Sequence, residues 1–345
     1  MNNGKMKSEA PQRVKERSVS KAKRGVTRPW PVTHVKVAAP STSANLGPGF
    51  DVFGLAHDTF QDVLEIEVTS KGKIEVEVSG VDESRVSRNL NKNTAGFVAN
   101  CVADRLPNGS GLRIHIDKGI PVGKGLGSSG ASAAACTFGL NRLLGLGLSS
   151  DEMICLAAKG ETASAGFPHA DNVAASILGG FVIVQSYEPC HAIRLSPPVN
   201  LGIALALPDV SAAEKKTELA RSVLPKLVPI EKMVHNIGRA SSMIVGILSA
   251  DLNLIGQSMV DAVIEPERAR LIPGYQKVRQ SALAAGAAGV AISGAGPTVI
   301  AVVDLKEISP IRVAEAMKEK FEAEGISCRA FSPKPSGGAK IVEEG

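Results

Sequence analysis

The stretch from Pro121 to Ala131 constrains this chain more than any other, because it holds four glycines and two serines directly before a helix-forming segment. Ala131, Ala134, Ala135 and Phe138 lie at i, i+3, i+4 and i+7, which predicts a helix to about residue 144. Glycines let backbone N–H groups turn toward a ligand, and a helix N-terminus adds N–H donors and a positive dipole end. The stretch therefore predicts an anion site, with phosphate as the usual occupant.

Three other interpretations of this stretch fit less well. A Walker A loop requires G-x-x-x-x-G-K followed by Ser or Thr, but Gly125 follows Lys124 here. The spacing of Gly125, Gly127 and Gly130 satisfies the dinucleotide pattern G-x-G-x-x-G. That pattern needs a strand directly before it and an acidic residue that ends the next strand, and the chain offers neither. A turn without a ligand is disfavoured by the entropic cost of so much glycine.

The same stretch resembles the second motif of the GHMP kinases, the superfamily that includes galactokinase, homoserine kinase, mevalonate kinase and phosphomevalonate kinase. Pro121 and the run from Gly125 to Ser129 carry the resemblance, and Gly130 departs from the alanine common there. The resemblance implies that this loop binds ATP. The implied ATP-binding residues are Pro121, Val122, Gly123, Lys124, Gly125, Leu126, Gly127, Ser128, Ser129, Gly130 and Ala131.

Composition sets the broad class of protein. The chain has 345 residues, 44% of them hydrophobic but only 3% aromatic, which predicts about two domains with aliphatic cores. Five cysteines without a C-x-x-C pair indicate reduced thiols in a cytosolic protein. We find no apolar run long enough for a membrane span and no signal peptide, so we expect a cytoplasmic protein.

Charge is concentrated at the N-terminus. Residues 1–30 hold nine Lys and Arg against two Glu, a net charge of +7, whereas the whole chain carries +5, so the remainder carries −2. This segment lacks apolar periodicity, which predicts a disordered basic extension. An organelle-targeting segment and a nucleic-acid arm are alternatives, and a solvated extension fits best. Residues 333–345, rich in Pro, Gly, Lys and Glu, predict a flexible tail.

A second segment resembles the homoserine kinases in particular. A strand at residues 35–39 leads into a predicted loop over residues 40–51, where Asn and Asp suit turns. The run from Ser43 to Asp51 resembles the first motif of homoserine kinases. The resemblance implies that Asn45 and Asp51 reach an amino-acid substrate and that Asp51 pairs with its ammonium group.

Two alternating segments, 64–68 and 74–78, predict a hairpin with one buried face and one acidic, solvated face. Asn93 is the predicted N-cap of a helix that continues to about Leu106. The resemblance implies that Asn93 and Thr94 help to seat adenine.

A helix predicted from Ser150 ends near Glu161, whose charge opposes the helix dipole and calls for a cation such as Mg²⁺. By resemblance, Glu161 and Ser129 are metal ligands, and His169 and Asn172 contact the substrate. Asp171 falls where other superfamily members carry a proposed general base, and whether it takes a proton stays open.

Two arginine segments and a third glycine-rich loop complete the resemblance. Arg221 and Arg268 lie in segments similar to those of homoserine kinases, and two such arginines predict a clamp for the substrate carboxylate. We expect Arg221, Asp171 and Asn172 to be the catalytic residues. The segment from Ile292 to Thr298 resembles the third motif, and Gly294 there brings the backbone close to the substrate.

The resemblance implies an α+β, two-domain GHMP kinase fold. Residues 31–198 would form an S5 domain 2-like N-terminal domain, which binds ATP on a mixed sheet with helices on one side. Residues 199–332 would form a ferredoxin-like α/β sandwich. The implied reaction is the Mg²⁺- and ATP-dependent phosphorylation of the L-homoserine hydroxyl to O-phospho-L-homoserine, a step toward threonine, by a homodimer.

Three alternatives remain. A mevalonate or sugar kinase is one, although a sugar has no ammonium or carboxylate group for Asp51 and the arginines. A non-catalytic GHMP-fold ligand sensor should have a broken phosphate loop or a lost metal ligand. A nucleic-acid binder would depend on residues 1–30.

Overall fold

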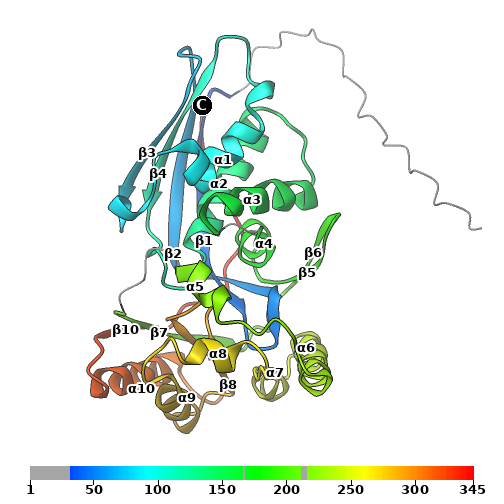
Figure 1. Cartoon of the computed structure of the whole chain (residues 1–345), viewed down its shortest axis with the longest axis vertical. Coiled ribbons are helices and arrows are strands. Elements are labelled where there is room, and N and C mark those ends of the chain that lie inside the picture. The colour runs from blue at the N-terminus through cyan, green and yellow to red at the C-terminus, as the bar shows by residue number, and fades with distance from the viewer. Residues whose placement is uncertain (1–31, 166–167, 211–215) are drawn as a thin grey trace, which may run out of the picture. The chain divides into compact units, whose positions relative to one another are not determined.

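The structure is a computed structural model that describes residues 32–165, 168–210 and 216–345. The predicted basic extension, residues 1–30, lies outside these residues. The protein contains a larger sheet of seven strands and a smaller sheet of four. Figure 1 shows how the strands of the two sheets are arranged. The larger sheet contains β1 (His34–Asn45), β2 (Gly49–Thr69), β3 (Ile74–Gly80), β4 (Gly111–Lys118), β5 (Phe181–Tyr187), β6 (Cys190–Leu195) and β11 (Lys340–Glu344). The smaller sheet contains β7 (Leu201–Pro208), β8 (Gly289–Ile292), β9 (Val299–Asp304) and β10 (Cys328–Phe331).

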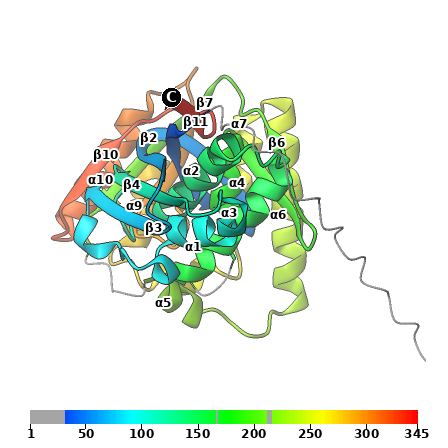
Figure 2. The ribbon, with the colours of Figure 1, turned by 90° about the horizontal axis from the view of Figure 1, so that it is seen from above.

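Four helices cover one face of the larger sheet (Figures 1 and 2). They are α1 (Thr94–Cys101), α2 (Ser128–Leu143), α3 (Ser150–Ala165) and α4 (Ala170–Leu178). Helix α2 packs on β1 and β2 and also contacts the other three helices. Its central residues Ala133, Ala134 and Ala135 are all fully buried. Small side chains on every side let α2 approach the sheet and its helical neighbours closely, which explains how a core with few aromatic residues is filled.

The smaller sheet has the strand order β10-β7-β9-β8. Helices α9 (Tyr275–Ala284) and α10 (Pro310–Ala323) connect its strands and bury Val278, Met317 and Phe321 in one core cluster with β8 and β9. Apart from further helices inserted between β7 and α9, the chain order β7-α9-β8-β9-α10-β10 is the ferredoxin-like arrangement. The predicted α+β class, with a mixed sheet and a ferredoxin-like sandwich, is confirmed. The remaining elements are α5 (Lys216–Ser222), α6 (Ile230–Ser249), α7 (Leu252–Ser258), α8 (Glu265–Ala269) and the short 3₁₀ helices η1 (Glu83–Arg85), η2 (Leu90–Lys92) and η3 (Ala103–Arg105).

The hairpin predicted between residues 64–68 and 74–78 is wrong. The two segments are strands with the expected alternation, but β4 lies between them, antiparallel to β2 and parallel to β3. Ile114 in β4 pairs with Ile66 on one side and with Val76 on the other. Helix α1 makes the crossover that a parallel pair requires. Alternation determined which face of each strand is buried, but it could not determine which strand lies beside it.

Two boundaries also differ from the sequence-based expectation. Most of the loop predicted at residues 40–51 is strand, because β1 continues to Asn45 and β2 begins at Gly49. Asn93 is the N-cap of α1 as predicted, since its side chain accepts the Gly96 N–H, but α1 ends at Cys101 rather than near Leu106. The predicted domain boundary after residue 198 falls in the link between β6 and β7 and stays a prediction.

The flexible tail predicted for residues 333–345 is also wrong over its last residues. Strand β11 pairs antiparallel with β1 and forms an edge of the larger sheet. Arg142 at the end of α2 forms a two-bonded ion pair with Glu344 at 2.7 and 2.8 Å. The Pro- and Gly-rich composition of residues 333–338 describes the connection to this strand and not its end.

Candidate active site

Backbone contacts bring the three predicted motifs together. The Thr42 N–H on β1 donates to Leu126 O of the glycine-rich loop at 3.1 Å. The Gly294 N–H donates to Ala44 O at 3.1 Å, and the Ser293 hydroxyl donates to Gly125 O at 2.6 Å. Segments that are far apart in the sequence, and that belong to both sheets, therefore meet at one place.

The glycine-rich loop connects β4 to α2, and it uses the conformational freedom of its glycines. Gly125 and Gly127 have positive φ angles of 78° and 69°, and Gly127 is the N-cap of α2. A Cβ atom at Gly125 would overlap the Ser293 carbonyl oxygen, and one at Gly127 would overlap the Thr42 hydroxyl. The first turn of α2 thus begins at Ser128, as a phosphate loop requires, with its N–H groups at the loop end of the helix.

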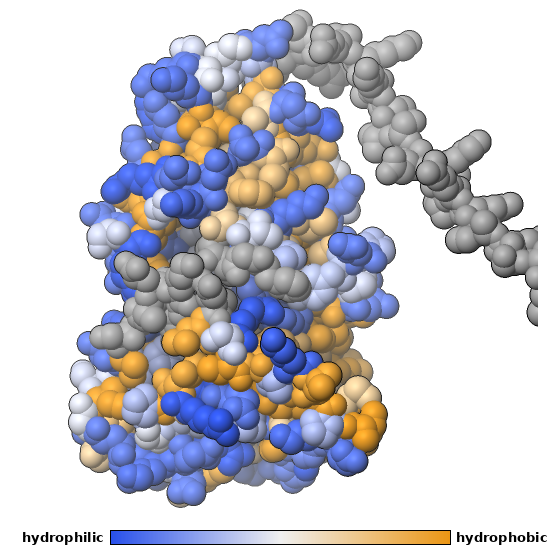
Figure 3. Space-filling model, viewed as in Figure 1, coloured by the Kyte–Doolittle hydropathy of each residue, from blue (hydrophilic) through white to orange (hydrophobic). Residues whose placement is uncertain are grey.

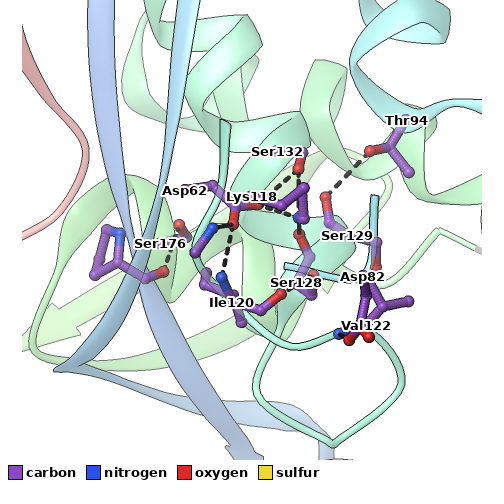
Figure 4. A network of polar contacts seen from close by, with 12 residues as sticks. Asp62, Asp82, Thr94, Lys118, Ile120, Val122, Ser128, Ser129, Ser132 and Ser176 are labelled. Atoms are coloured by element: carbon purple, nitrogen blue, oxygen red, sulfur yellow. Dashed lines mark hydrogen bonds and ion pairs between the residues drawn. The ribbon is translucent and has the colours of Figure 1, made fainter. Parts of the chain in front are cut away.

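A buried ion pair stabilises the conformation of the glycine-rich loop (Figure 4). The Lys118 ammonium at the end of β4 contacts the Asp62 carboxylate on β2, and it also donates to Ser128 O and to the Ser132 hydroxyl, both at 2.9 Å. The second oxygen of Asp62 accepts the N–H groups of Gly119 and Ile120 at 3.2 and 3.0 Å. The pair therefore fixes both ends of the loop, the exit from β4 and the start of α2.

Two side chains of the predicted ATP-binding loop form polar contacts with other parts of the protein. The Lys124 ammonium donates to Val210 O at 3.0 Å and lies 3.3 Å from the Asp209 carboxylate, at the end of β7. The Ser128 hydroxyl donates to Ile120 O at 2.9 Å. Any contribution of Ser128 to a phosphate would thus come through its backbone N–H.

Ser129 and Glu161 lie together, as the predicted metal pair requires. The Ser129 hydroxyl donates to Glu161 Oε2 at 2.9 Å, and Glu161 is only 4% exposed. Burial raises the pKa of Glu161 to about 7, and the Ser129 hydrogen bond opposes the shift. Helix α3 continues to Ala165, so Glu161 lies about one turn before its end and not at its end.

These two residues fit a magnesium ion. Hydroxyl and carboxylate oxygens are hard ligands that Mg²⁺ accepts, and a desolvated carboxylate gains from a nearby cation. Among the described residues there is no group of three or more His, Cys, Asp or Glu placed to hold a metal. Two protein ligands are enough when phosphates and water supply the rest, as is usual for Mg²⁺ with nucleotides.

Asn45 joins the first motif to the third. Its amide nitrogen donates to Gly294 O at 3.0 Å, and its amide oxygen accepts the Asp51 N–H at 3.1 Å. Asn45 and Asp51 both have positive φ angles, 71° and 57°, which Asn and Asp tolerate better than most residues. Asn45 therefore holds the turn that presents Asp51.

Asp51 is paired with one of the predicted clamp arginines. Arg221 Nη2 lies 2.7 Å from Asp51 Oδ2, and the same guanidinium contacts His169 Nε2 at 2.8 and 3.0 Å. Asp51 comes from the start of β2, Arg221 from α5 and His169 from the residue before α4. The structure thus joins three predicted substrate contacts in one cluster.

Arg268 on α8 lies beside this cluster and is only 5% exposed. It donates to Gly294 O at 2.9 Å, and its guanidinium lies 5.0 Å from the centre of the Phe50 ring. The Arg221 guanidinium lies 5.6 Å from the same ring. Burial lowers the pKa of Arg268, and the Asp51 carboxylate opposes that shift. Phe50 therefore holds both arginines through cation–π contacts.

Asp171 and Asn172 begin α4, close to the phosphate loop. Asp171 Oδ1 accepts the backbone and side-chain N–H groups of Asn172 at 2.8 and 3.1 Å. The Asn172 amide oxygen accepts the Thr42 hydroxyl at 2.8 Å. Burial, together with the nearby negative charge of Asp51, raises the pKa of Asp171 to about 7. A carboxyl group of this kind can exchange a proton near neutral pH.

The amide oxygen and the amide nitrogen of the Asn93 side chain both form hydrogen bonds. Its oxygen caps α1, and its nitrogen donates to Ser87 O at 2.7 Å. The Thr94 hydroxyl donates to Ser129 O at 3.2 Å and so connects α1 to the phosphate loop. The predicted contact of these residues with adenine stays a prediction.

Sequence reasoning missed Asp62, Lys118 and Tyr187. The Tyr187 hydroxyl donates to Asp51 O at 2.8 Å from β5. A lysine directly before a glycine-rich loop was the available signal for the buried pair. No sequence signal pointed to Tyr187.

Comparisons with protein families give two matches. The model described as "GHMP kinases N terminal domain" matches residues 92–180, and the model described as "GHMP kinases C terminal" matches residues 243–323. The first covers the phosphate loop and Glu161. The second covers Arg268 and the third motif.

Individual relatives agree with these matches. The homoserine kinase of Methanococcus vannielii is 44% identical over 281 residues, which cover 79% of this chain and 91% of the relative. The homoserine kinase of Halorubrum lacusprofundi is 42% identical over 310 residues, 90% of this chain and 100% of the relative. A crystal structure of homoserine kinase from Cytophaga hutchinsonii superposes with a TM-score of 0.82 at 34% identity and covers 93% of this chain and 100% of that one.

We predict that Lys118→Met lowers the free energy of unfolding by about 3–5 kcal/mol, because it leaves the Asp62 carboxylate buried without its countercharge. Urea denaturation measures the change. The double variant Asp62→Asn/Lys118→Met should lose less stability than Lys118→Met alone, because no uncompensated charge remains. Lys71→Met is the matched control, because its ion pair with Glu75 is long and exposed. Equal effects at positions 118 and 71 would contradict a supporting role for the buried pair.

A second prediction concerns Glu265 on α8, which accepts the Tyr275 hydroxyl at 2.7 Å and the Ile292 N–H at 3.4 Å. Burial raises its pKa to about 7. Between pH 5 and pH 7 the Glu265 carboxyl keeps its proton in the folded protein but has released it in the unfolded chain. The free energy of unfolding therefore falls as the pH rises through this range. The stability of the wild type relative to Glu265→Gln should therefore fall by a few kcal/mol from pH 5 to pH 8. A pH-independent difference in urea denaturation would refute the raised pKa.

Proposed function

The chain belongs to the homoserine kinases of the GHMP kinase superfamily, which are ATP-dependent kinases acting on an alcohol group, and we propose how its residues recognise L-homoserine and transfer the γ-phosphoryl group of ATP. The observation that carries the proposal is the 2.7 Å ion pair between Asp51 and Arg221 beside the phosphate loop. It supplies one negative and one positive group, which are the partners that a zwitterionic amino acid needs.

The nucleotide phosphates are assigned to residues 121–131. Phosphoryl transfer needs in-line positioning and stabilisation of charge more than covalent catalysis. The first turn of α2 offers N–H groups and the positive end of the helix dipole. Asp62 and Lys118 hold the loop in this conformation before ATP binds. Ser129 and Glu161 are the residues that would hold Mg²⁺, which supplies charge neutralisation between the phosphates when bound.

The amino-acid substrate is assigned to the cluster around Asp51 and Arg221. Without substrate the two groups neutralise each other. When homoserine binds, Asp51 accepts the substrate ammonium group and Arg221 binds the carboxylate, so one internal ion pair is exchanged for two intermolecular ones. His169, which already contacts Arg221, orients the guanidinium. Arg268 adds positive charge from its buried position on the Phe50 ring.

Asp171 and Asn172 are assigned to the reacting hydroxyl. They lie at the start of α4, and Asn172 is connected to Thr42 beside the phosphate loop. A carboxyl group with a pKa of about 7 could accept the hydroxyl proton as the phosphoryl group transfers. Positioning alone supplies a large part of the rate, up to about 7–11 kcal/mol in well-oriented systems, so the proton transfer is an addition to it.

The alternatives have less support from these residues. A mevalonate or sugar substrate would leave the Asp51 carboxylate without an ammonium partner. A ligand sensor without catalysis would not need the intact phosphate loop or the contact between Ser129 and Glu161. We place the enzyme in the cytoplasm, because its five cysteines are free thiols. No described helix has the length and apolar character of a membrane span.

We predict that Arg221→Ala lowers kcat/KM for L-homoserine about 10- to 100-fold, because it removes charge-assisted hydrogen bonds worth about 1.5–3 kcal/mol. The KM for ATP should stay within about twofold, because Arg221 lies outside the phosphate loop. ADP release with ATP, Mg²⁺ and L-homoserine measures both. The matched control is Arg270→Ala, because this arginine directly follows α8, has a side chain that is 75% exposed, and pairs with Glu267.

The same assay should compare L-threonine, L-serine, mevalonate and galactose as acceptors. Turnover with homoserine and not with galactose or mevalonate supports the proposal. Faster turnover with mevalonate or galactose would keep the kinase and overturn the assigned substrate site. Equal losses in Arg221→Ala and Arg270→Ala would remove Arg221 from that site.

A further inference from the structure

His57 on β2 is a polar side chain inside the protein. Hydrophilic side chains are spread over the visible surface in Figure 3, where water satisfies their hydrogen bonds. His57 is instead fully buried, and burial lowers its pKa to about 3, so the imidazole is neutral at pH 7. Its Nδ1 atom lies 2.8 Å from the Thr59 hydroxyl and 3.0 Å from the Ser41 hydroxyl, and its Nε2 atom lies 3.1 Å from the Ser43 hydroxyl. Both ring nitrogens therefore have hydrogen-bond partners within the protein.

The pairing of β1 with β2 places His57 within reach of both serines. Ser41 lies directly opposite His57 in the antiparallel pair, and its hydroxyl also donates to His57 O at 3.0 Å. Ser43 is two residues further along β1, so its side chain projects from the same face of the strand as that of Ser41. A long side chain opposite one residue can reach the next residue of that face along the diagonal. The register of the two strands thus directs the Nε2 atom of His57 to Ser43.

From Ser43 the polar contacts continue to the phosphate loop. The hydroxyl oxygens of Ser43 and Ser293 are 2.8 Å apart, and the Ser293 hydroxyl donates to Gly125 O at 2.6 Å. Ser43 and Ser293 are both fully buried. A line of buried contacts therefore connects His57 to Gly125 through two serine hydroxyls, one on β1 and one in the third glycine-rich loop. We call it the His57 line.

The direction of each hydrogen bond in the His57 line follows from its last member. Gly125 O can only accept, so it takes the one hydroxyl proton of Ser293. Ser43 must then donate to Ser293 Oγ, and His57 Nε2 must donate to Ser43 Oγ. His57 is therefore the neutral tautomer with its proton on Nε2, and Nδ1 accepts the Thr59 hydroxyl. Every donor in the line is directed toward the phosphate loop.

The His57 line holds the peptide group between Gly125 and Leu126. The C=O and N–H groups of a trans peptide point in opposite directions, so a carbonyl held toward Ser293 turns the Leu126 N–H away from it. Among the residues that the structure describes, none accepts a hydrogen bond from the Leu126 N–H. Backbone N–H groups in folded proteins normally have a partner, so this one is available to a ligand of the loop.

The backbone on both sides of Ser43 contacts the same two loops. The Thr42 N–H donates to Leu126 O at 3.1 Å, and Ala44 O accepts the Gly294 N–H at 3.1 Å. The Ser43 side chain thus lies between the strand's contact with the phosphate loop and its contact with the third loop. A shift of Ser43 would move both contacts, which is why its hydrogen bond from His57 matters to the site.

We propose that His57 is a positioning residue for nucleotide binding, which acts through Ser43 and Ser293 to present the Leu126 N–H to the phosphates of ATP. The inference rests on the proposed assignment of the phosphates to residues 121–131. A role in packing alone is the other interpretation of a buried histidine, and it predicts a different order among substitutions. Leucine fills the space of the imidazole without an unpaired polar atom, whereas glutamine keeps a donor and buries an amide.

Calorimetric titration of the full chain with Mg²⁺ and the non-hydrolysable ATP analogue AMP-PNP tests the proposal. The Kd should rise about 3- to 10-fold in His57→Leu, because the donor to Ser43 is lost. It should stay within about twofold of the wild type in His57→Gln, because the glutamine amide N–H replaces that donor. A larger effect of His57→Gln than of His57→Leu would overturn the proposal in favour of packing. Far-UV circular dichroism confirms that each variant is folded.

The matched control is His115→Leu. The Nε2 atom of His115 on β4 lies 2.9 Å from the Ser79 hydroxyl on β3, a similar contact between histidine and serine on neighbouring strands. It has no connection to Gly125 among the described contacts, so the Kd for AMP-PNP should stay within about twofold of the wild type. An effect equal to that of His57→Leu would show a general response to the loss of a histidine and would contradict the proposal.

A double-mutant cycle tests whether His57 acts through Ser293. Ser293→Ala removes the donor to Gly125 O, so adding His57→Leu to it should raise the Kd no further. Additive effects would overturn the His57 line. If His57→Leu does not fold, Ser43→Ala takes its place in the cycle, with the same expectation. Nitrogen-15 NMR of the wild type at pH 7 should show His57 as the neutral Nε2–H tautomer, and the Nδ1–H tautomer or an imidazolium would contradict the assigned direction.

These measurements separate the inference from the proposed function. A wild type that does not bind AMP-PNP with Mg²⁺ would overturn both, because the phosphates would then lack a site on residues 121–131. A wild type that binds the analogue, with a Kd unchanged within about twofold in His57→Leu, would overturn the role of His57 alone. Neither outcome depends on which alcohol accepts the phosphoryl group.

Discussion

The active site depends on one close backbone approach, the contact between the phosphate loop at Gly125 and the third glycine-rich loop at Ser293. A Cβ atom at Gly125 would overlap the Ser293 carbonyl oxygen, so the two loops can meet only through glycine. The Ser293 hydroxyl then bonds Gly125 O, and Gly294 bonds both Ala44 and Asn45. Loops from the two sheets thereby hold one another in place before any ligand arrives. Such preorganisation is what phosphoryl transfer needs most, because it replaces solvent reorganisation with fixed donors.

Several buried ionisable groups around these loops lower the stability of the folded protein, and a bound ligand can offset this loss. Glu161 and Asp171 are buried carboxyl groups with pKa values raised to about 7, and Arg268 is a buried guanidinium with a lowered pKa. Buried groups of this kind lower the stability of the folded protein unless they gain partners. In contrast, Asp62 and Lys118 neutralise each other permanently and serve the loop's shape. Asp51 and Arg221 are intermediate: they form an ion pair in the protein without substrate, and in the proposed function each exchanges this partner for a charged group of the substrate.

The sequence predicted the parts of this site that rest on local chemistry. The glycine-rich loop, the start of α2 and the Asn93 N-cap follow from backbone conformations that few residues allow, and they appear where expected. The order of the strands in the sheet could not be predicted. Apolar and polar residues alternate in β2 and β3 in the same way whether or not β4 lies between these strands. The pair of Asp62 and Lys118, 56 residues apart, and the pairing of β11 with β1 are tertiary contacts that no local pattern encodes. The catalytic and binding roles of the site residues remain predictions of the resemblance together with this geometry.

The most direct test of the account removes one charge of the substrate at a time. We would measure kcat/KM for L-homoserine, for 4-hydroxybutyrate, which lacks the ammonium group, and for 3-aminopropan-1-ol, which lacks the carboxylate. The account predicts that each analogue loses at least on the order of 10²- to 10⁴-fold, because each leaves Asp51 or Arg221 without its partner in a site built to bind both. Turnover of 4-hydroxybutyrate within about tenfold of homoserine would contradict the exchange of the Asp51–Arg221 ion pair on which the proposed recognition rests.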